Sequence, residues 1–166
     1  QDRGCWSVIT TGDRPSTMFD LLVKADARDG GRRADEYYVH AIRLGHATAA
    51  LDRVPSADEL DALILPGGFG AAKNLCDFAV NGPDCSVDPG VAALVRAVHA
   101  QGKPVASVCI APALIAKVLG DEGPELTIGT DADTAGALAS MGAAHIECSV
   151  TEFVVDEKRK LISSPA

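Results

Sequence analysis

Residues 104–117 read PVASVCIAPALIAK, and the pattern of this stretch changes at a single cysteine. Its first part, Val105–Val108, is a short apolar run typical of a buried strand. After Cys109 the apolar residues recur at helical spacing. Pro112 falls in the first helical turn, where its missing N–H removes no helical hydrogen bond. The stretch therefore predicts a strand that turns sharply into a helix at Cys109.

A cysteine at such a turn has the position of a nucleophile. Its thiol would face unpaired backbone N–H groups and the positive end of a helix dipole, and both favour the thiolate. The alternative is an inert side chain, because free cysteines are among the most buried residues of proteins. This stretch alone leaves both interpretations open.

A second stretch, residues 60–75, reads LDALILPGGFGAAKNL. The apolar run before Pro66 predicts another strand, and the pair Gly67 and Gly68 lies at its carboxyl end. A glycine pair can bring backbone N–H groups close to a ligand, although an ordinary tight turn explains it too. Ligands of open parallel sheets bind outside the carboxyl ends of the strands. We therefore predict one crevice shared by the glycine pair and Cys109.

Within this crevice we expect the N–H groups of Gly68 and Ile110 to act as oxyanion donors beside the sulfur. The further pocket candidates are Gly67, Lys73, Asn74 and Thr130. A cation at Lys73 could hold a substrate carbonyl or carboxylate, while a plain surface lysine is the alternative.

Three segments in this order, LILPGGFGAAKNL, PVASVCIAPALIAKVLG and LTIGTDADTAGALASMGA, carry a family resemblance. They resemble the superfamily of PfpI-type proteases, the Parkinson-linked deglycase and class I glutamine amidotransferases. The resemblance covers about 57–166. It implies a flavodoxin-like three-layer α/β sandwich with a mainly parallel central sheet and a nucleophile elbow at Cys109. We expect one amidotransferase-like domain over 1–166, of which 1–56 matches poorly.

Within that superfamily the sequence is most similar to the ElbB-type glyoxalase-like proteins, a group also associated with isoprenoid biosynthesis. The resemblance implies a glyoxalase III-like lyase with Cys109 as its catalytic residue. Such an enzyme converts a small 2-oxoaldehyde, methylglyoxal or glyoxal, to a 2-hydroxy acid without glutathione or another cofactor. The implied partner is a small carbonyl substrate, and since relatives are often dimeric, a homodimer is expected.

The sequence also departs from the family pattern. Members begin with a strand and a glycine-rich turn whose glutamate contacts the cysteine, and they end with a further helix; we expect both to be missing here. Gln1 is not an initiator methionine, so we expect a chain that is processed, trimmed or incomplete at its start. The reaction needs a base to move a proton between two carbons. Asp13 is the candidate for this acid–base residue, although turn formation explains an aspartate at this position equally well.

Two other functions compete with the enzyme. A non-catalytic redox-sensing or binding protein could keep the fold and the thiol, because an accessible thiolate oxidises selectively. Hydrolase or amidotransferase chemistry is disfavoured, since those relatives place a histidine after the cysteine and this sequence has Ile110.

The amino-acid composition excludes several classes of partner and site. A chain of 166 residues with 47% hydrophobic residues can bury one globular core. A net charge of −8 argues against nucleic acid as a partner, because phosphate recognition needs clustered Lys and Arg. No run approaches the roughly 20 apolar residues of a membrane span, so no membrane is expected. The five cysteines are widely spaced and form no C-x-x-C motif, which predicts no disulfide framework and favours a reducing cytoplasm. The four histidines are scattered along the chain, so no metal site is expected.

Strands and helices are predicted to alternate along the chain, which favours a mainly parallel sheet. Ser56 with Glu59 predicts a capping box, and Asp88 with Pro89 predicts a helix start. The remaining expectations are strands at 5–11, 62–65, 126–128, 153–155 and 161–163, and helices from 71 through 78, over 90–101 and over 133–141.

Overall fold

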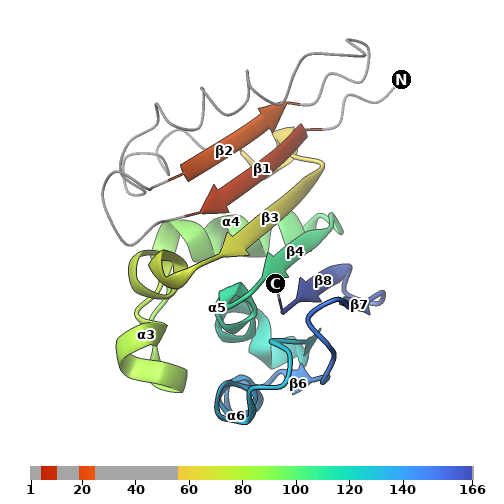
Figure 1. Cartoon of the computed structure of the whole chain (residues 1–166). Helices are drawn as coiled ribbons and strands as arrows, with labels where there is room; N and C mark the ends of the chain where they lie inside the picture. The colour runs from red at the N-terminus through yellow and green to blue at the C-terminus, as the bar shows by residue number, and fades with distance from the viewer. Residues whose placement is uncertain (1–4, 11–18, 25–55, 166) are drawn as a thin grey trace.

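The computed structural model describes residues 5–10, 19–24 and 56–165 (Figure 1). The strands are β1 (Cys5–Thr10), β2 (Phe19–Lys24), β3 (Ala62–Gly67), β4 (Val105–Val108), β5 (Glu125–Leu126), β6 (Ala144–His145), β7 (Val154–Asp156) and β8 (Leu161–Ser164). The α-helices are α3 (Phe78–Asn81), α4 (Pro89–Ala100), α5 (Ala111–Leu119) and α6 (Ala132–Ser140). Short turns of other helix types are η2 (Ala57–Glu59), η3 (Ala71–Leu75), η4 (Gly82–Asp84) and η5 (Gly120–Glu122).

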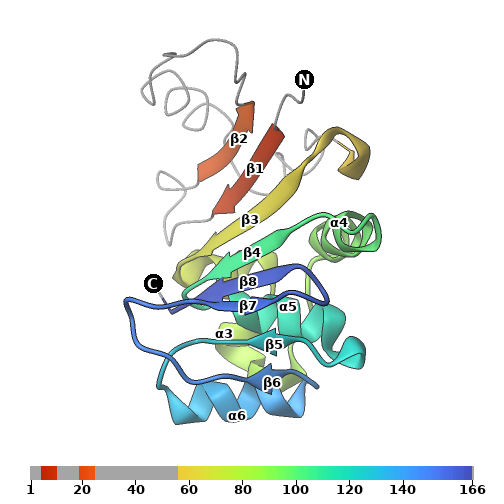
Figure 2. The ribbon, with the colours of Figure 1, turned by 90° about the vertical axis from the view of Figure 1, so that its right-hand side faces the viewer.

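Six strands form the central sheet in the order β2-β1-β3-β4-β8-β7. The four inner strands β1, β3, β4 and β8 run parallel, and the edge strands β2 and β7 run antiparallel to their neighbours. The short strands β5 and β6 form a separate parallel pair beside β7 and β8, with α6 packed against β6 (Figure 2). The predicted α/β fold with a mainly parallel central sheet is confirmed.

The core lies between this sheet and the helices α4 and α5, which contact each other as well as β3 and β4. Leu63 pairs with Val105, and Val105 pairs with Leu161, so three buried side chains line up across the sheet. Val91 of α4 and Leu114 of α5 are among the helix residues that belong to the same buried cluster. This packing fixes β4 as the middle of the described core, which is the strand that carries Cys109 at its end.

Capping residues were predicted with mixed success. Asp88 accepts hydrogen bonds from the N–H groups of Gly90 and Val91 at 2.9 and 3.1 Å, which confirms the predicted start of α4. Asp131 caps α6 in the same way, by accepting from the N–H of Asp133. The capping box at Ser56 was wrong, because η2 is a single 3-10 turn and the Ser56 side chain makes no cap bond.

Two predicted elements differ from the structure because tertiary contacts interrupt them. The helix expected from 71 through 78 is a π-helical turn followed by the separate α3, since Cys76 between them is extended and pairs with Val87. The strand expected at 126–128 ends at Leu126. There the N–H of Thr127 turns to the Ser163 hydroxyl, at 2.9 Å, instead of continuing the ladder.

The β7–β8 turn depends on one buried carboxylate, that of Asp156. It accepts from the N–H of Glu125, at 3.0 Å, and from the backbone and guanidinium of Arg159, at 3.1 and 2.9 Å. Burial raises the pKa of Asp156, but these hydrogen bonds outweigh it and hold the pKa below its ordinary value. A depressed folded pKa contributes stability above the unfolded pKa of about 3.9, and this stability is lost as the pH falls through the folded value.

We expect Asp156→Asn to lower the free energy of unfolding by about 2 kcal/mol at pH 7, because its amide group would face N–H donors. The difference from the wild type should begin to shrink as the pH falls below about 4, where the unfolded chain binds the proton, and should be lost at lower pH as the folded Asp156 is protonated too. Urea unfolding at both pH values measures it. Glu157→Gln, at the exposed neighbour of Asp156, is the control. An equal loss in the two variants would contradict the role of the Asp156 hydrogen bonds.

Candidate active site

Cys109 lies between the end of β4 and the start of α5, which confirms the predicted turn from strand to helix. Its φ is +60°, and among the described residues Lys160 is the one other non-glycine residue with a positive φ. A side chain in this region costs about 1–2 kcal/mol. The backbone strain lifts the thiol out of the core, and the Cys109 side chain is exposed.

The last strand of the sheet holds this strained turn in place. The N–H of Cys109 donates to the carbonyl oxygen of Ser164, the final residue of β8, at 2.9 Å. The hydroxyl of Ser164 donates in turn to the carbonyl of Glu152, at 3.2 Å. The position of the thiol therefore depends on β8 as well as on β4, a contribution that no residue pattern around Cys109 predicts.

Gly67, the first residue of the glycine pair, lies directly against the turn that carries Cys109. Gly67 ends β3 with φ +83°, and a Cβ added there would collide with the carbonyl oxygen of Val108 and lie 3.1 Å from the Cys109 Cβ. Gly68, also in the left-handed region at φ +81°, is exposed and accepts from the N–H of Ala71 through its carbonyl. The structure thus brings Gly67 and Cys109 together at the carboxyl ends of neighbouring strands.

The first turn of α5 follows Cys109 directly. Ile110 is the N-cap residue, with an αR backbone, and it makes no side-chain cap bond; the proline of the first turn is Pro112, as predicted. A helix start without a capping side chain leaves its first N–H groups available to a ligand. All residues of α5 except Lys117 are buried, so this helix end is anchored firmly in the core.

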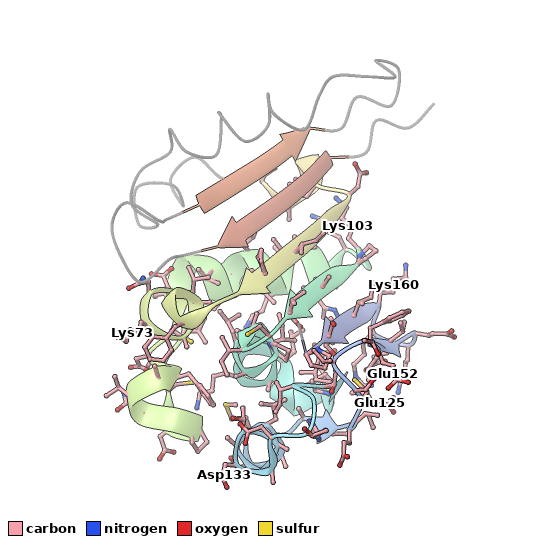
Figure 3. All side chains as sticks on the ribbon, viewed as in Figure 1. Lys73, Lys103, Glu125, Asp133, Glu152 and Lys160 are labelled. Carbon is pink, nitrogen blue, oxygen red and sulfur yellow. The ribbon has the colours of Figure 1, made fainter. Side chains whose placement is uncertain are left out.

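Lys73 and Asn74 lie in η3, and both are exposed. The ammonium of Lys73 lies 4.4 Å from the centroid of the Phe69 ring, and the ring itself is 54% exposed. This cation–π contact holds a positive charge beyond the carboxyl end of β3 (Figure 3). Phe69 was not among the predicted pocket residues, although it follows the glycine pair directly.

Thr130 is exposed next to a close backbone contact. The preceding Gly129 has φ +91°, and a Cβ there would lie 3.1 Å from the Cβ of Pro165, the residue after β8. The hydroxyl of Thr127 accepts from the N–H of Gly129, at 3.0 Å, and from the thiol of Cys148, at 3.4 Å. These contacts tie the segment that bears Thr130 to the same strand end that holds Cys109.

The other cysteines differ from Cys109 in their surroundings. Cys76 and Cys85 are buried, and burial raises the pKa of both thiols. Cys148 is half-buried, and none of Cys76, Cys85, Cys109 and Cys148 is in a disulfide. Of these four thiols, that of Cys109 is the one that is exposed.

Several candidates are placed elsewhere or are not described. His99, one of the four scattered histidines, is half-buried with Nε2 3.0 Å from the carboxylate of Glu122. Asp13 lies outside the described residues. In the part of the chain that the structure describes, no group of three or more His, Cys, Asp or Glu side chains could hold a metal ion. No described helix is long and apolar enough to cross a membrane.

Comparison with known proteins gives a consistent result. The human protein named "Glutamine amidotransferase-like class 1 domain-containing protein 3, mitochondrial" is 46% identical over 120 residues, which are 67% of this chain and 44% of that protein. The zebrafish "ES1 protein, mitochondrial" is 35% identical over 121 residues, with 66% and 44% covered. This chain thus spans less than half the length of these relatives. Their names place them in mitochondria, and the cytoplasmic location of this chain stays a prediction.

Among solved structures, an isoprenoid biosynthesis protein with an amidotransferase-like domain from Ehrlichia chaffeensis superposes with a TM-score of 0.62 and 30% identity. The match covers 75% of this chain and 59% of that one. The family model described as DJ-1/PfpI family matches residues 45–166, which include every described element from η2 onward. The elbow at Cys109 and the family match over residues 45–166 agree: the chain belongs to the DJ-1/PfpI family.

Proposed function

We propose that this protein is a cysteine-dependent glyoxalase-like lyase that converts small 2-oxoaldehydes such as methylglyoxal to 2-hydroxy acids. The observation that carries the proposal is the exposed thiol of Cys109 on a positive-φ turn, with the backbone of Gly67 against it. A strained turn that exposes one nucleophile at the carboxyl edge of a parallel sheet is typical of a catalytic elbow.

The proposed reaction begins when the Cys109 thiolate adds to the aldehyde carbon of methylglyoxal, forming a hemithioacetal. A base removes the proton from that carbon, and a proton returns to the neighbouring ketone carbon, giving a thioester. Water then cleaves the thioester to lactate and restores the thiol. The sum is methylglyoxal plus water to lactic acid, so no external oxidant, reductant or glutathione is needed.

The residues around the sulfur have separate roles in this proposal. The N–H groups of Gly68 and Ile110 stabilise the negative oxygen that develops after thiolate attack. Lys73 attracts the carboxylate of the product and the polarised ketone of the substrate, with Asn74 and Thr130 at the rim. The proton-transferring base is the role for which Asp13 is the sequence candidate.

We do not extend the word "amidotransferase" in the names of the relatives to this chain. The relatives with hydrolase or amidotransferase chemistry place a histidine after the cysteine, and this sequence has Ile110 there, whose side chain cannot accept a proton. The proposal is therefore confined to aldehyde chemistry.

Iodoacetamide should alkylate Cys109 before Cys76, Cys85 and Cys148, because its thiol is exposed while theirs are buried or half-buried. Loss of lactate formation from methylglyoxal, in a buffer without glutathione, should follow Cys109 alkylation in proportion. Peptide mass spectrometry and a lactate assay on the same samples measure both. Activity that persists after Cys109 is fully alkylated would contradict the proposal.

The second candidate, a redox-sensing or binding protein, draws on the same exposed thiol. It predicts that Cys109 is alkylated first and is also oxidised first by dilute peroxide, yet that no lactate forms before either treatment. The untreated sample thus separates the two functions, since only the lyase turns over methylglyoxal.

A further inference from the structure

A hollow of about 350 Å³ lies outside the Cys109 site. Three separate segments form its walls: the end of α4 with the following turn, η5, and the turn between β7 and β8. The side chains and backbone that matter to its chemistry belong to His99, Gly102, Glu122, Lys158, Arg159 and Lys160. Its size falls at the lower end of the range for small-molecule pockets.

This hollow lies at the opposite end of the sheet from the candidate active site. Gly102 precedes β4 and Lys160 precedes β8, so the hollow is at the amino ends of two parallel strands, whereas Cys109 follows the carboxyl end of β4. Figure 3 shows Lys160 and Lys73 on opposite sides of the molecule. A ligand in this hollow would not occupy the Cys109 crevice.

Two of the charged residues around the hollow, Arg159 and Glu122, form hydrogen bonds that connect its walls. The guanidinium of Arg159 donates to the Asp156 carboxylate, at 2.9 Å, and to the carbonyl of Glu122. The carboxylate of Glu122 lies 3.0 Å from Nε2 of His99. These contacts join the β7–β8 turn to η5 and α4, so the walls are held together without a ligand, and the charges of Arg159 and Glu122 are already engaged.

The ammonium groups of Lys158 and Lys160 have N–H donors that no described residue accepts. Lys160 adopts φ +55°, and its ammonium donates one hydrogen bond to the carbonyl of Gly102, at 2.7 Å. This leaves two of its three N–H donors without a partner among the described residues. Lys158 is exposed and makes no hydrogen bond or ion pair with any residue that the structure describes. Two cations face one concave surface on a chain whose net charge is −8.

We propose that this hollow binds a small molecule through a phosphate group, held by the ammonium groups of Lys158 and Lys160. A phosphate dianion matches the charge of two lysines that line one hollow, and lysine binds phosphate as a point charge without a fixed donor geometry. The rest of the hollow, with the braced His99 and the backbone of Gly102, leaves room for a small organic group on the phosphate.

An NMR titration of the intact protein with inorganic phosphate tests this, with acetate as the monoanionic comparison at equal ionic strength. Phosphate should give saturable shifts of the backbone amides of Gly102 and 158–160. Lys158→Gln should weaken this binding about tenfold, the loss expected for one charge-assisted hydrogen bond. Lys73→Gln, which removes the same charge at the other end of the sheet, should leave it unchanged.

Three results would overturn the proposal: shifts that rise linearly without saturation, equal effects of acetate and phosphate, or unchanged phosphate affinity in Lys158→Gln. Because Lys158 is exposed and makes no hydrogen bond or ion pair with the described residues, its replacement should leave folding intact, and urea unfolding of the variant checks this. The readout does not involve methylglyoxal, so it fails or succeeds independently of the proposed lyase activity.

Discussion

Cys109→Ser should lower kcat/KM for methylglyoxal at least about 100-fold, while the free energy of unfolding changes by less than about 1 kcal/mol. The serine hydroxyl fits the same exposed position, but at neutral pH it is a far weaker nucleophile than a thiol and forms no thioester. Lactate formation at several methylglyoxal concentrations gives kcat/KM, and urea unfolding gives the stability.

The matched control is Cys148→Ser. The Cys148 thiol is half-buried and donates to the Thr127 hydroxyl at 3.4 Å, a contact that a serine hydroxyl can also make. Its kcat/KM should stay within about twofold of the wild type, the change expected of a residue outside the reaction. Equal rates for wild type and Cys109→Ser would remove the thiol from the mechanism and the proposed lyase with it.

Gly67→Ala should destabilise the protein by about 3–5 kcal/mol, which is among the largest effects of a single methyl group. Two costs add at this position: φ is +83°, and the new Cβ would collide with the carbonyl oxygen of Val108. Neither atom can move without separating β3 from β4. Urea unfolding monitored by circular dichroism measures the loss.

Two other glycines separate these costs. Gly82 has φ +52° and ψ −131° but nothing within 4 Å of an added Cβ, so Gly82→Ala should cost only the backbone strain, about 1–3 kcal/mol. Gly136 lies inside α6, also with nothing within 4 Å, and Gly136→Ala should stabilise the protein by up to about 1 kcal/mol. If Gly67→Ala cost no more than Gly82→Ala, the close contact with β4 would be ruled out as the reason for this glycine.

The elements that the sequence predicts well are those whose signals are local. The start of α4 follows from the carboxylate of Asp88 and the ring of Pro89, both of which act within one helical turn. The elbow at Cys109 follows from the change of apolar period from strand to helix. The turn at Gly67 is predicted equally well from the glycine pair, because left-handed backbone is nearly confined to glycine.

The features that were missed depend on residues far apart in the chain. Thr127 leaves its strand because Ser163 offers a hydroxyl from β8, and no pattern near 127 contains that information. The extended Cys76 divides a predicted helix by pairing with Val87. The acid of the proposed reaction is a different case, since Asp13 lies outside the described residues and its role stays a prediction.

The hydrogen bond from Cys109 to Ser164 has a consequence for the order in which the domain folds. β4 can pair with β3 as soon as both have been synthesised, but its other neighbour, β8, comes much later in the chain. Contacts between such distant segments form late, because closing a long loop costs entropy before the contact stabilises anything. We therefore expect the elbow to be completed after β3 and β4 have paired, so that a partly folded chain should hold Cys109 in a relaxed backbone. The geometry that makes this thiol distinctive would then depend on the pairing of β4 with β8.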